Sequence, residues 1–170
     1  MKKNLTILKT LDEARQQVYV GRQLHTLGLI RWITEQTGKA DVIVTTFSTS
    51  VEFLSGFFNL KKENLIGNAV VVLDLKAAKK TARLNTLLTS CFDEVYLAEN
   101  HTKIVLVYNA DHHVCVITSM NNTYGGRNEC TFISTDEDLF FSLHMEVQKI
   151  IHNSYRYDRP KPISTDSANG

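Results

Sequence analysis

Core-strand patterns alternate with helical patterns along the first hundred residues, and this order limits the fold more than any other feature of the sequence. Residues 42–47 and 69–73 are β-branched, apolar runs typical of buried strands. A helical pattern follows each run: Thr49 and Glu52 have the spacing of a capping box, and residues 76–89 resemble a second helix. Strand–helix–strand–helix order predicts an α/β domain with helices on the faces of its sheet.

The flanking segments extend this α/β pattern in both directions. Apolar residues at steps of three and four predict a helix over residues 11–37, and Gly38 follows as a stop. Further elements are expected after residue 90: strands at 94–97, 103–108, 114–118 and 130–134, with a last helix from Thr135 to about 155. We expect one domain over residues 1–158, with the helical segment 1–38 packed on it and a flexible tail over 159–170.

Composition narrows the function only slightly. Hydrophobic residues make up 43% and charged residues 22%, as in ordinary globular domains, and the net charge of +1 neither supports nor excludes a nucleic-acid ligand. The sequence contains neither a signal-peptide pattern nor an apolar run of about 18 residues, which predicts a cytoplasmic protein without a membrane span. Cys115 and Cys130 lie in strand-like runs and are expected to be buried thiols. Zinc spacing is lacking, so neither metal nor cofactor is expected.

Polar residues gather at the ends of the predicted strands between residues 100 and 129. His101 and Lys103 share a face, because side chains alternate along a strand. If strands 103–108 and 114–118 pair as a hairpin, His101 lies at the same end as Ser119 and Asn121. Such a group suits a phosphoryl centre: lysine and asparagine offer donors to phosphate oxygens, and a neutral histidine acts as nucleophile or as acid and base.

Plainer interpretations stand beside this one. Ser119 and Asn121 also fit ordinary loop hydrogen bonding, and Arg127 fits either a phosphate contact or a solvated position beside Glu129. His112 and His113 are interpreted as solvated turn residues rather than metal ligands. A basic helical face is usually solvated but is also a candidate for binding a phosphate backbone; its residues are Lys76, Lys79, Lys80 and Arg83.

The segment from His101-Thr102-Lys103 to Thr118-Ser119-Met120-Asn121 resembles the HxK…(G/S)SxN signature of the phospholipase D superfamily, and Glu129 matches that family's downstream glutamate. The resemblance covers about residues 40–153 and implies a mixed sheet flanked by helices on both faces. It implies that His101 attacks phosphorus to form a phosphohistidine, that Lys103 and Asn121 bind phosphate oxygens with Ser119 in support, and that Glu129 orients an imidazole. Arg127 remains a candidate substrate contact.

The family needs two such motifs per active site, and this chain has one. The resemblance therefore implies a homodimer, as in the family's small bacterial endonucleases, with a metal-independent phosphodiesterase, most simply a nuclease, as the activity. Tyr108 stands where the family usually has an aspartate, and Asp111 is out of register with that position. This departure leaves an alternative: a degenerate module that binds nucleic acid or another phosphate ligand without cleavage. A lipid phosphodiesterase fits least.

Overall fold

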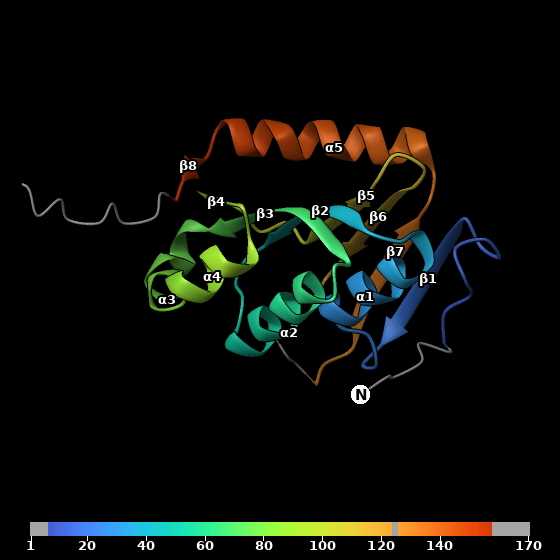
Figure 1. Ribbon diagram of the computed structural model, residues 1–170, viewed down its shortest axis with the longest axis horizontal. Helices are drawn as coiled ribbons and strands as arrows, with labels where there is room; N and C mark the ends of the chain where they lie inside the picture. The colour runs from blue at the N-terminus through green and yellow to red at the C-terminus, as the bar shows by residue number, and fades with distance from the viewer. Residues whose placement is uncertain (1–6, 124–125, 158–170) are drawn as a thin grey trace, which may run out of the picture.

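A mixed sheet lies between two layers of helices (Figure 1). The computed structural model describes residues 7–123 and 126–157. Within these residues the sheet has eight strands, in the spatial order β1 (Gln16–Gly21), β7 (Glu129–Ser134), β6 (His113–Thr118), β5 (Ile104–Tyr108), β2 (Ala40–Thr46), β3 (Ile66–Asp74), β4 (Glu94–Ala98) and β8 (Tyr155–Arg156). Among the described strands, β2, β3 and β4 pair in parallel and the others pair antiparallel. The expected mixed α/β sheet, flanked by helices on both faces, is confirmed.

The helices α1 (Thr26–Thr37), α2 (Val51–Lys62), α3 (Ala78–Arg83) and α4 (Asn85–Cys91) lie on one side of the sheet in Figure 1. Val42 and Val44 of β2 join the core on this side, whereas Ile43 joins the core on the other side. Because β2 is buried on both faces, its sequence is a continuous apolar run rather than an alternating one.

The long helix α5 (Glu137–His152) covers the opposite face (Figure 1). Phe140 and Val147 are its buried residues and pack with Leu106 and Cys115. The helix begins at Glu137, and its cap is Asp136 rather than the expected Thr135: the Asp136 carboxylate accepts from the Leu139 N–H at 2.9 Å. It ends at His152 rather than near 155, because β8 pairs with the edge of β4.

The prediction of a helix over residues 11–37 is wrong in its first half. Gln16–Gly21 form β1, which pairs antiparallel with β7, so that Val18 faces Phe132 and Val20 faces Cys130 across the two strands. The helical part of the N-terminal segment is α1, where the His25 imidazole accepts from the Gly28 N–H at 2.9 Å. Pairing with a neighbouring strand has overridden the local periodicity.

Smaller corrections concern helix ends and cysteines. The predicted helix 76–89 divides into a 3₁₀ turn (Leu75–Ala77), α3 and α4, and the cap of α2 is Ser50 rather than Thr49. Cys115 is buried, and burial raises the pKa of its thiol to about 11. Cys130 is exposed, contrary to expectation: it lies in β7 opposite Val20 of β1, which is also exposed. The tail 159–170 lies outside the described residues.

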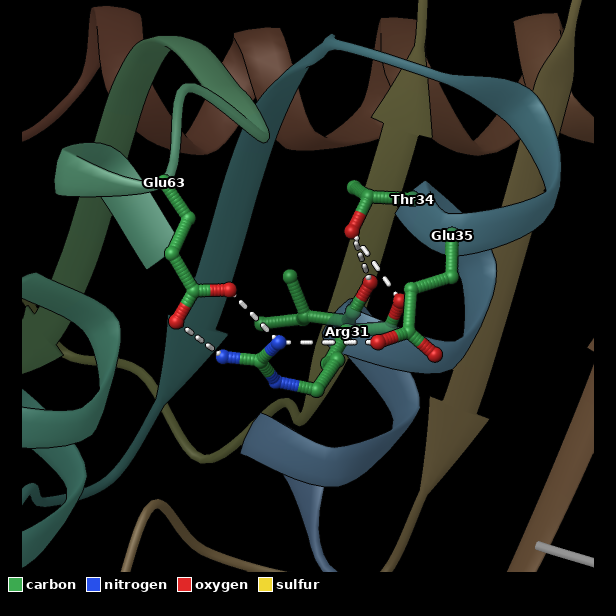
Figure 2. A network of polar contacts seen from close by, with 5 residues as sticks. Arg31, Thr34, Glu35 and Glu63 are labelled. Carbon is green, nitrogen blue, oxygen red and sulfur yellow. Dashed lines mark hydrogen bonds and ion pairs between the residues drawn. The ribbon is translucent and has the colours of Figure 1, made fainter. Parts of the chain in front are cut away.

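An ion-paired network joins α1 to the end of α2 (Figure 2). Both terminal nitrogens of Arg31 donate to the Glu63 carboxylate at 2.7 Å, and Arg31 also reaches Glu35 at 3.5 Å. The hydrogen bond from Arg31 lowers the pKa of Glu63. This two-pronged contact fixes the position of one helix relative to the other. The contact between Arg31 and Glu63 bears on the candidate site, because the first turns of α1 and α2 line a cavity that Asn121 also lines.

Candidate functional site

The predicted site residues follow or precede strand ends at one edge of the sheet. The Thr118 N–H donates to the Lys103 carbonyl at 3.0 Å, which pairs the start of β5 with the end of β6. The Ser119 N–H donates to the Cys130 carbonyl at 3.0 Å and brings in the start of β7. The Asn122 N–H reaches the Thr46 hydroxyl at 3.3 Å, at the end of β2. Segments 101–103, 119–122 and 129–130 therefore meet at this edge, as the hairpin prediction expected.

Side chains on both sides of His101 fasten its loop to the sheet. Asn100 is 3% exposed; its amide donates to the Thr46 carbonyl at 3.2 Å, and its backbone N–H donates to Asp74 at 2.8 Å. The Thr102 hydroxyl lies 2.7 Å from that of Thr45. Because these neighbours are tied to β2 and β3, the backbone that carries His101 is held in place while its side chain remains exposed.

His101 and Lys103 lie side by side, as the strand alternation predicted. The Lys103 ammonium is 3.4 Å from Nδ1 of His101 and donates to the His101 carbonyl at 2.8 Å. The Phe47 ring meets the imidazole edge-on, with the ring centres 5.6 Å apart. Nδ1 is therefore the ring nitrogen of His101 that lies on the side of the ammonium.

Ser119 and Glu129 form a second close pair at this edge. The Ser119 hydroxyl donates to the Glu129 carboxylate and accepts from the Cys130 N–H at 3.0 Å. Within the described part of one chain, the recorded side-chain partner of Glu129 is therefore Ser119 rather than an imidazole. Arg127, also expected at the site, is exposed in the loop before β7.

Asn121 is half-buried, and its carboxamide oxygen is fully buried without a hydrogen-bond partner among the described residues. The side chain lines a cavity of about 250 Å³ between the first turns of α1 and α2. A buried carbonyl oxygen without a partner is uncommon in native structures.

Tyr108 lies at the other end of β5, away from His101. It pairs with His113 and Asp41 across the sheet, and its ring meets Phe140 of α5 edge-on at 5.6 Å. It is five residue steps along the chain from Lys103, which corresponds to about 17 Å in an extended strand. The neighbouring Asp111 belongs to the hairpin turn, where its N–H donates to the Asn109 side chain at 3.0 Å.

The sequence pattern missed the residues that support the site. The loop before β5 is held by Asn100, Thr46 and Asp74. The sequence signals available for this role were that Asn100 precedes His101 and that Thr46 and Asp74 lie at the ends of apolar runs. The two turn histidines differ: His112 is exposed, whereas His113 packs its ring against Phe140 and Phe141 at 5.0 and 4.9 Å. Of the basic helical face, Lys76, Lys79 and Arg83 are exposed.

Comparison with known proteins identifies the fold. No family model and no curated protein matches the sequence. Among solved structures, Nuc, a phospholipase D family member from Salmonella typhimurium, matches with a TM-score of 0.66 and 18% identity, over 85% of this chain and 99% of Nuc. NucT from Helicobacter pylori matches with a TM-score of 0.62 and 10% identity, over 84% of this chain and 98% of NucT.

A polyphosphate kinase from Porphyromonas gingivalis gives a TM-score of 0.63 and 12% identity, over 92% of this chain and 30% of the kinase. The chain therefore has the same fold as Nuc, a phospholipase D family member, which confirms the expected fold. Among residues 7–123 and 126–157, no helix has both the length and the apolar character to cross a bilayer.

Proposed function

We propose that this chain is a metal-independent phosphodiesterase that cleaves nucleic acid through a phosphohistidine, at a site completed by a second copy. The observation that supports it is the pairing of His101 with Lys103 beside the Ser119–Glu129 pair, at one edge of a phospholipase D fold. These groups provide a nucleophile and a cation, with a carboxylate held nearby by a hydroxyl.

The proposed reaction has two steps. Nε2 of His101 attacks phosphorus, a P–N bond forms and the P–O bond to the leaving group breaks, while the partner's His101 protonates the leaving oxygen. Water then attacks phosphorus and the P–N bond breaks, with the partner's His101 accepting the proton from water. Lys103 and the Asn121 amide stabilise the charge on the nonbridging oxygens, and Arg127 contacts a phosphate of the substrate.

Glu129 is proposed to orient an imidazole across the two-fold axis. Ser119 donates to Oε2 of this carboxylate, so Oε1 is the oxygen that would accept an imidazole N–H. A carboxylate that accepts one imidazole N–H fixes the tautomer in which the other ring nitrogen keeps its lone pair and can attack phosphorus.

An uncovered apolar strip supports the pairing of two copies. Val18 and Val20 of β1 are each 70% exposed, and Ile117 of β6 is 38% exposed. The register places all three on the face that α5 covers elsewhere, and β1 ends opposite Glu129. A strip of this kind, on strands that end near Glu129 and Ser119, is what a second copy would cover while bringing its own His101 to the site.

The test is cleavage of single- and double-stranded DNA and RNA in EDTA by the wild-type chain, by His101→Ala and by His112→Ala. His112 is an exposed histidine in the turn at the other end of the hairpin and serves as the matched control. We expect cleavage by the wild type and by His112→Ala, and a loss of about 10³-fold or more for His101→Ala. Absence of cleavage of DNA, RNA and model phosphodiesters in EDTA would refute the proposal.

Binding without cleavage is the second candidate, and the position of Lys103 favours it. Its ammonium donates to the backbone carbonyl of His101, so part of its charge is engaged within the chain. Salt-dependent binding of oligonucleotides by a folded dimer that turns over no substrate would select this function.

A further inference from the structure

The segment between β3 and β4 concentrates positive charge. Residues 75–92 contain no aspartate or glutamate and four cations, Lys76, Lys79, Lys80 and Arg83. The segment therefore has a net charge of +4, and because the whole chain carries +1, the remaining residues together carry −3. A local concentration of cations in a nearly neutral chain indicates a polyanionic ligand for this segment.

Three of these cations form one exposed row. The side chains of Lys76, Lys79 and Arg83, which make up the basic stripe, are exposed. They follow one another at steps of three and four residues along the 3₁₀ turn and α3, so they lie on one side of the segment. At a helical rise of 1.5 Å per residue the basic stripe is about 10 Å long, which matches about three stacked nucleotides.

The charges of the basic stripe are not neutralised within the described part of the chain. None of its three cations forms an ion pair with a described carboxylate. By contrast, Lys61 pairs with Asp93 at 2.9 Å, and Lys149 pairs with Glu146 at 2.7 Å. The cations of the basic stripe are therefore available to an anionic ligand.

One carboxylate joins the start of the basic stripe to the loop of His101. Asp74, the last residue of β3, accepts from the Lys76 N–H at 2.7 Å through Oδ1 and from the Asn100 N–H at 2.8 Å through Oδ2. Two backbone nitrogens bound to one carboxylate lie at most on the order of 8 Å apart. Because Asn100 precedes His101, the basic stripe begins close to the backbone that carries the proposed nucleophile.

The other face of the sheet is acidic near this edge. A groove between the end of β4 and α5 is lined by the carboxylates of Glu99 and Glu146, and α5 carries three carboxylates and one lysine. The helix α3 lies on the face opposite α5 (Figure 1). Since carboxylates repel phosphates, a phosphate backbone leaving His101 is directed away from α5 and toward the basic stripe.

We infer that the basic stripe binds the phosphate backbone of a nucleic-acid strand where the strand extends beyond the His101 site. Its cations contact phosphate oxygens rather than bases, so the contact is independent of base sequence. A membrane-binding helix carries large apolar residues beside its cations, and none is exposed among the described residues of 75–92. The inference rests on the proposed function and adds a surface that holds the substrate outside the cleaved bond.

The experiment measures binding of a fluorescein-labelled oligothymidine by fluorescence anisotropy at several salt concentrations, in the His101→Ala protein so that no strand is cleaved. The stripe variant adds Lys76→Gln, Lys79→Gln and Arg83→Gln, because glutamine removes the charge and keeps the helix propensity. Loss of three phosphate contacts should reduce the slope of log affinity against log salt by about 2. Binding at 0.1 M salt should then be roughly 100-fold weaker.

A matched control removes three exposed charges elsewhere, by Lys9→Gln, Lys39→Gln and Lys149→Gln. Lys9 lies beside the start of β1 and Lys39 precedes β2, both at the sheet edge away from His101, and Lys149 lies on α5. The control variant has the same net charge as the stripe variant. It should change the salt slope by clearly less than 1.

An equal loss of affinity in the two variants, or an unchanged affinity in the stripe variant, overturns the inference. Urea denaturation checks that both variants are folded, and the single variants Lys79→Gln and Arg83→Gln, each expected to lower the slope by about 0.7, replace a triple variant that is not. A stripe variant that loses binding to phosphatidylserine vesicles but not to oligothymidine also overturns it.

The two proposals can fail separately. A wild type that cleaves nucleic acid, together with a stripe variant that binds oligothymidine as the control does, would refute the basic stripe alone. A loss of binding confined to the stripe variant, in a protein that cleaves no substrate, would support the basic stripe and refute only the catalytic proposal.

Discussion

Tyr108 stands where the phospholipase D signature has an aspartate, and its surroundings do not suit a carboxylate. The ring packs against Phe140 and lies 5.9 Å from His144 of α5, and Asp41 is its partner across the sheet. Burial, and then the charge of Asp41, raise the pKa of the Tyr108 hydroxyl. An aspartate here would place a second negative group in a partly buried position beside Asp41.

Substitution at this position tests whether the departure affects activity. Tyr108→Phe should keep both stability and cleavage, because the ring contacts with α5 remain. Tyr108→Asp should lower the free energy of unfolding by about 2 kcal/mol or more without raising activity. Urea denaturation and cleavage assays on the two variants check this, and a more active Tyr108→Asp protein would contradict it.

The positions of the candidate site residues could be predicted from the sequence, but their hydrogen bonds could not. Strand alternation and hairpin pairing place His101, Lys103 and Ser119 at one sheet edge, since both follow from local periodicity. The bond from Asn100 to the Thr46 carbonyl joins residues 54 positions apart and depends on which strands are neighbours. The pairing of Glu129 with Ser119, rather than with an imidazole, likewise depends on the register of β6 and β7.

At the scale of elements, β1 shows where periodicity fails. Val18 fits a helical stripe with Ala14, yet Val18 and Val20 also fit the alternation of a strand, and a short segment carries too few residues to decide. The unpaired edge of β7 decides for a strand. The start of α1 likewise lacks a sequence signal, because its cap is His25 rather than serine, threonine, aspartate or asparagine.

Attachment of α5 to the sheet should depend on Phe140 and much less on its neighbour. Phe140 is 1% exposed and contacts Tyr108 and His113, whereas Phe141 is 50% exposed. Phe140→Ala should lower the free energy of unfolding by about 3–5 kcal/mol, through lost burial and the cavity left behind. Phe141→Ala should have a clearly smaller effect in the same denaturation experiment, and equal losses would show that the assigned packing is wrong.

For the whole molecule, the order of elements in the sequence was enough to predict the α/β class and the mixed sheet. The core runs of β2 and β3 and the helices between them carry that information locally. The sheet order places β7 between β1 and β6, and this follows from long-range pairing that periodicity does not encode.

Association of two copies is the prediction that belongs to this scale. Light scattering at micromolar concentration should give about twice the 19.3 kDa of one chain. Val18→Glu should shift the protein toward the monomer and reduce cleavage, because it places a charge in the uncovered apolar strip. Met145→Glu, at a residue 61% exposed on α5, is the matched control and should remain dimeric. A wild type that is only monomeric would remove the basis of the shared site.

Because His101 is exposed and would be completed by a second copy, activity would depend on the concentration of the chain. On the proposed pairing, the number of working centres in dilute solution rises with the square of the chain concentration. Newly synthesised chains would then remain inactive monomers at low concentration and become active as dimers at high concentration. Abundance itself would act as the safeguard against premature damage to nucleic acid, without a separate inhibitor.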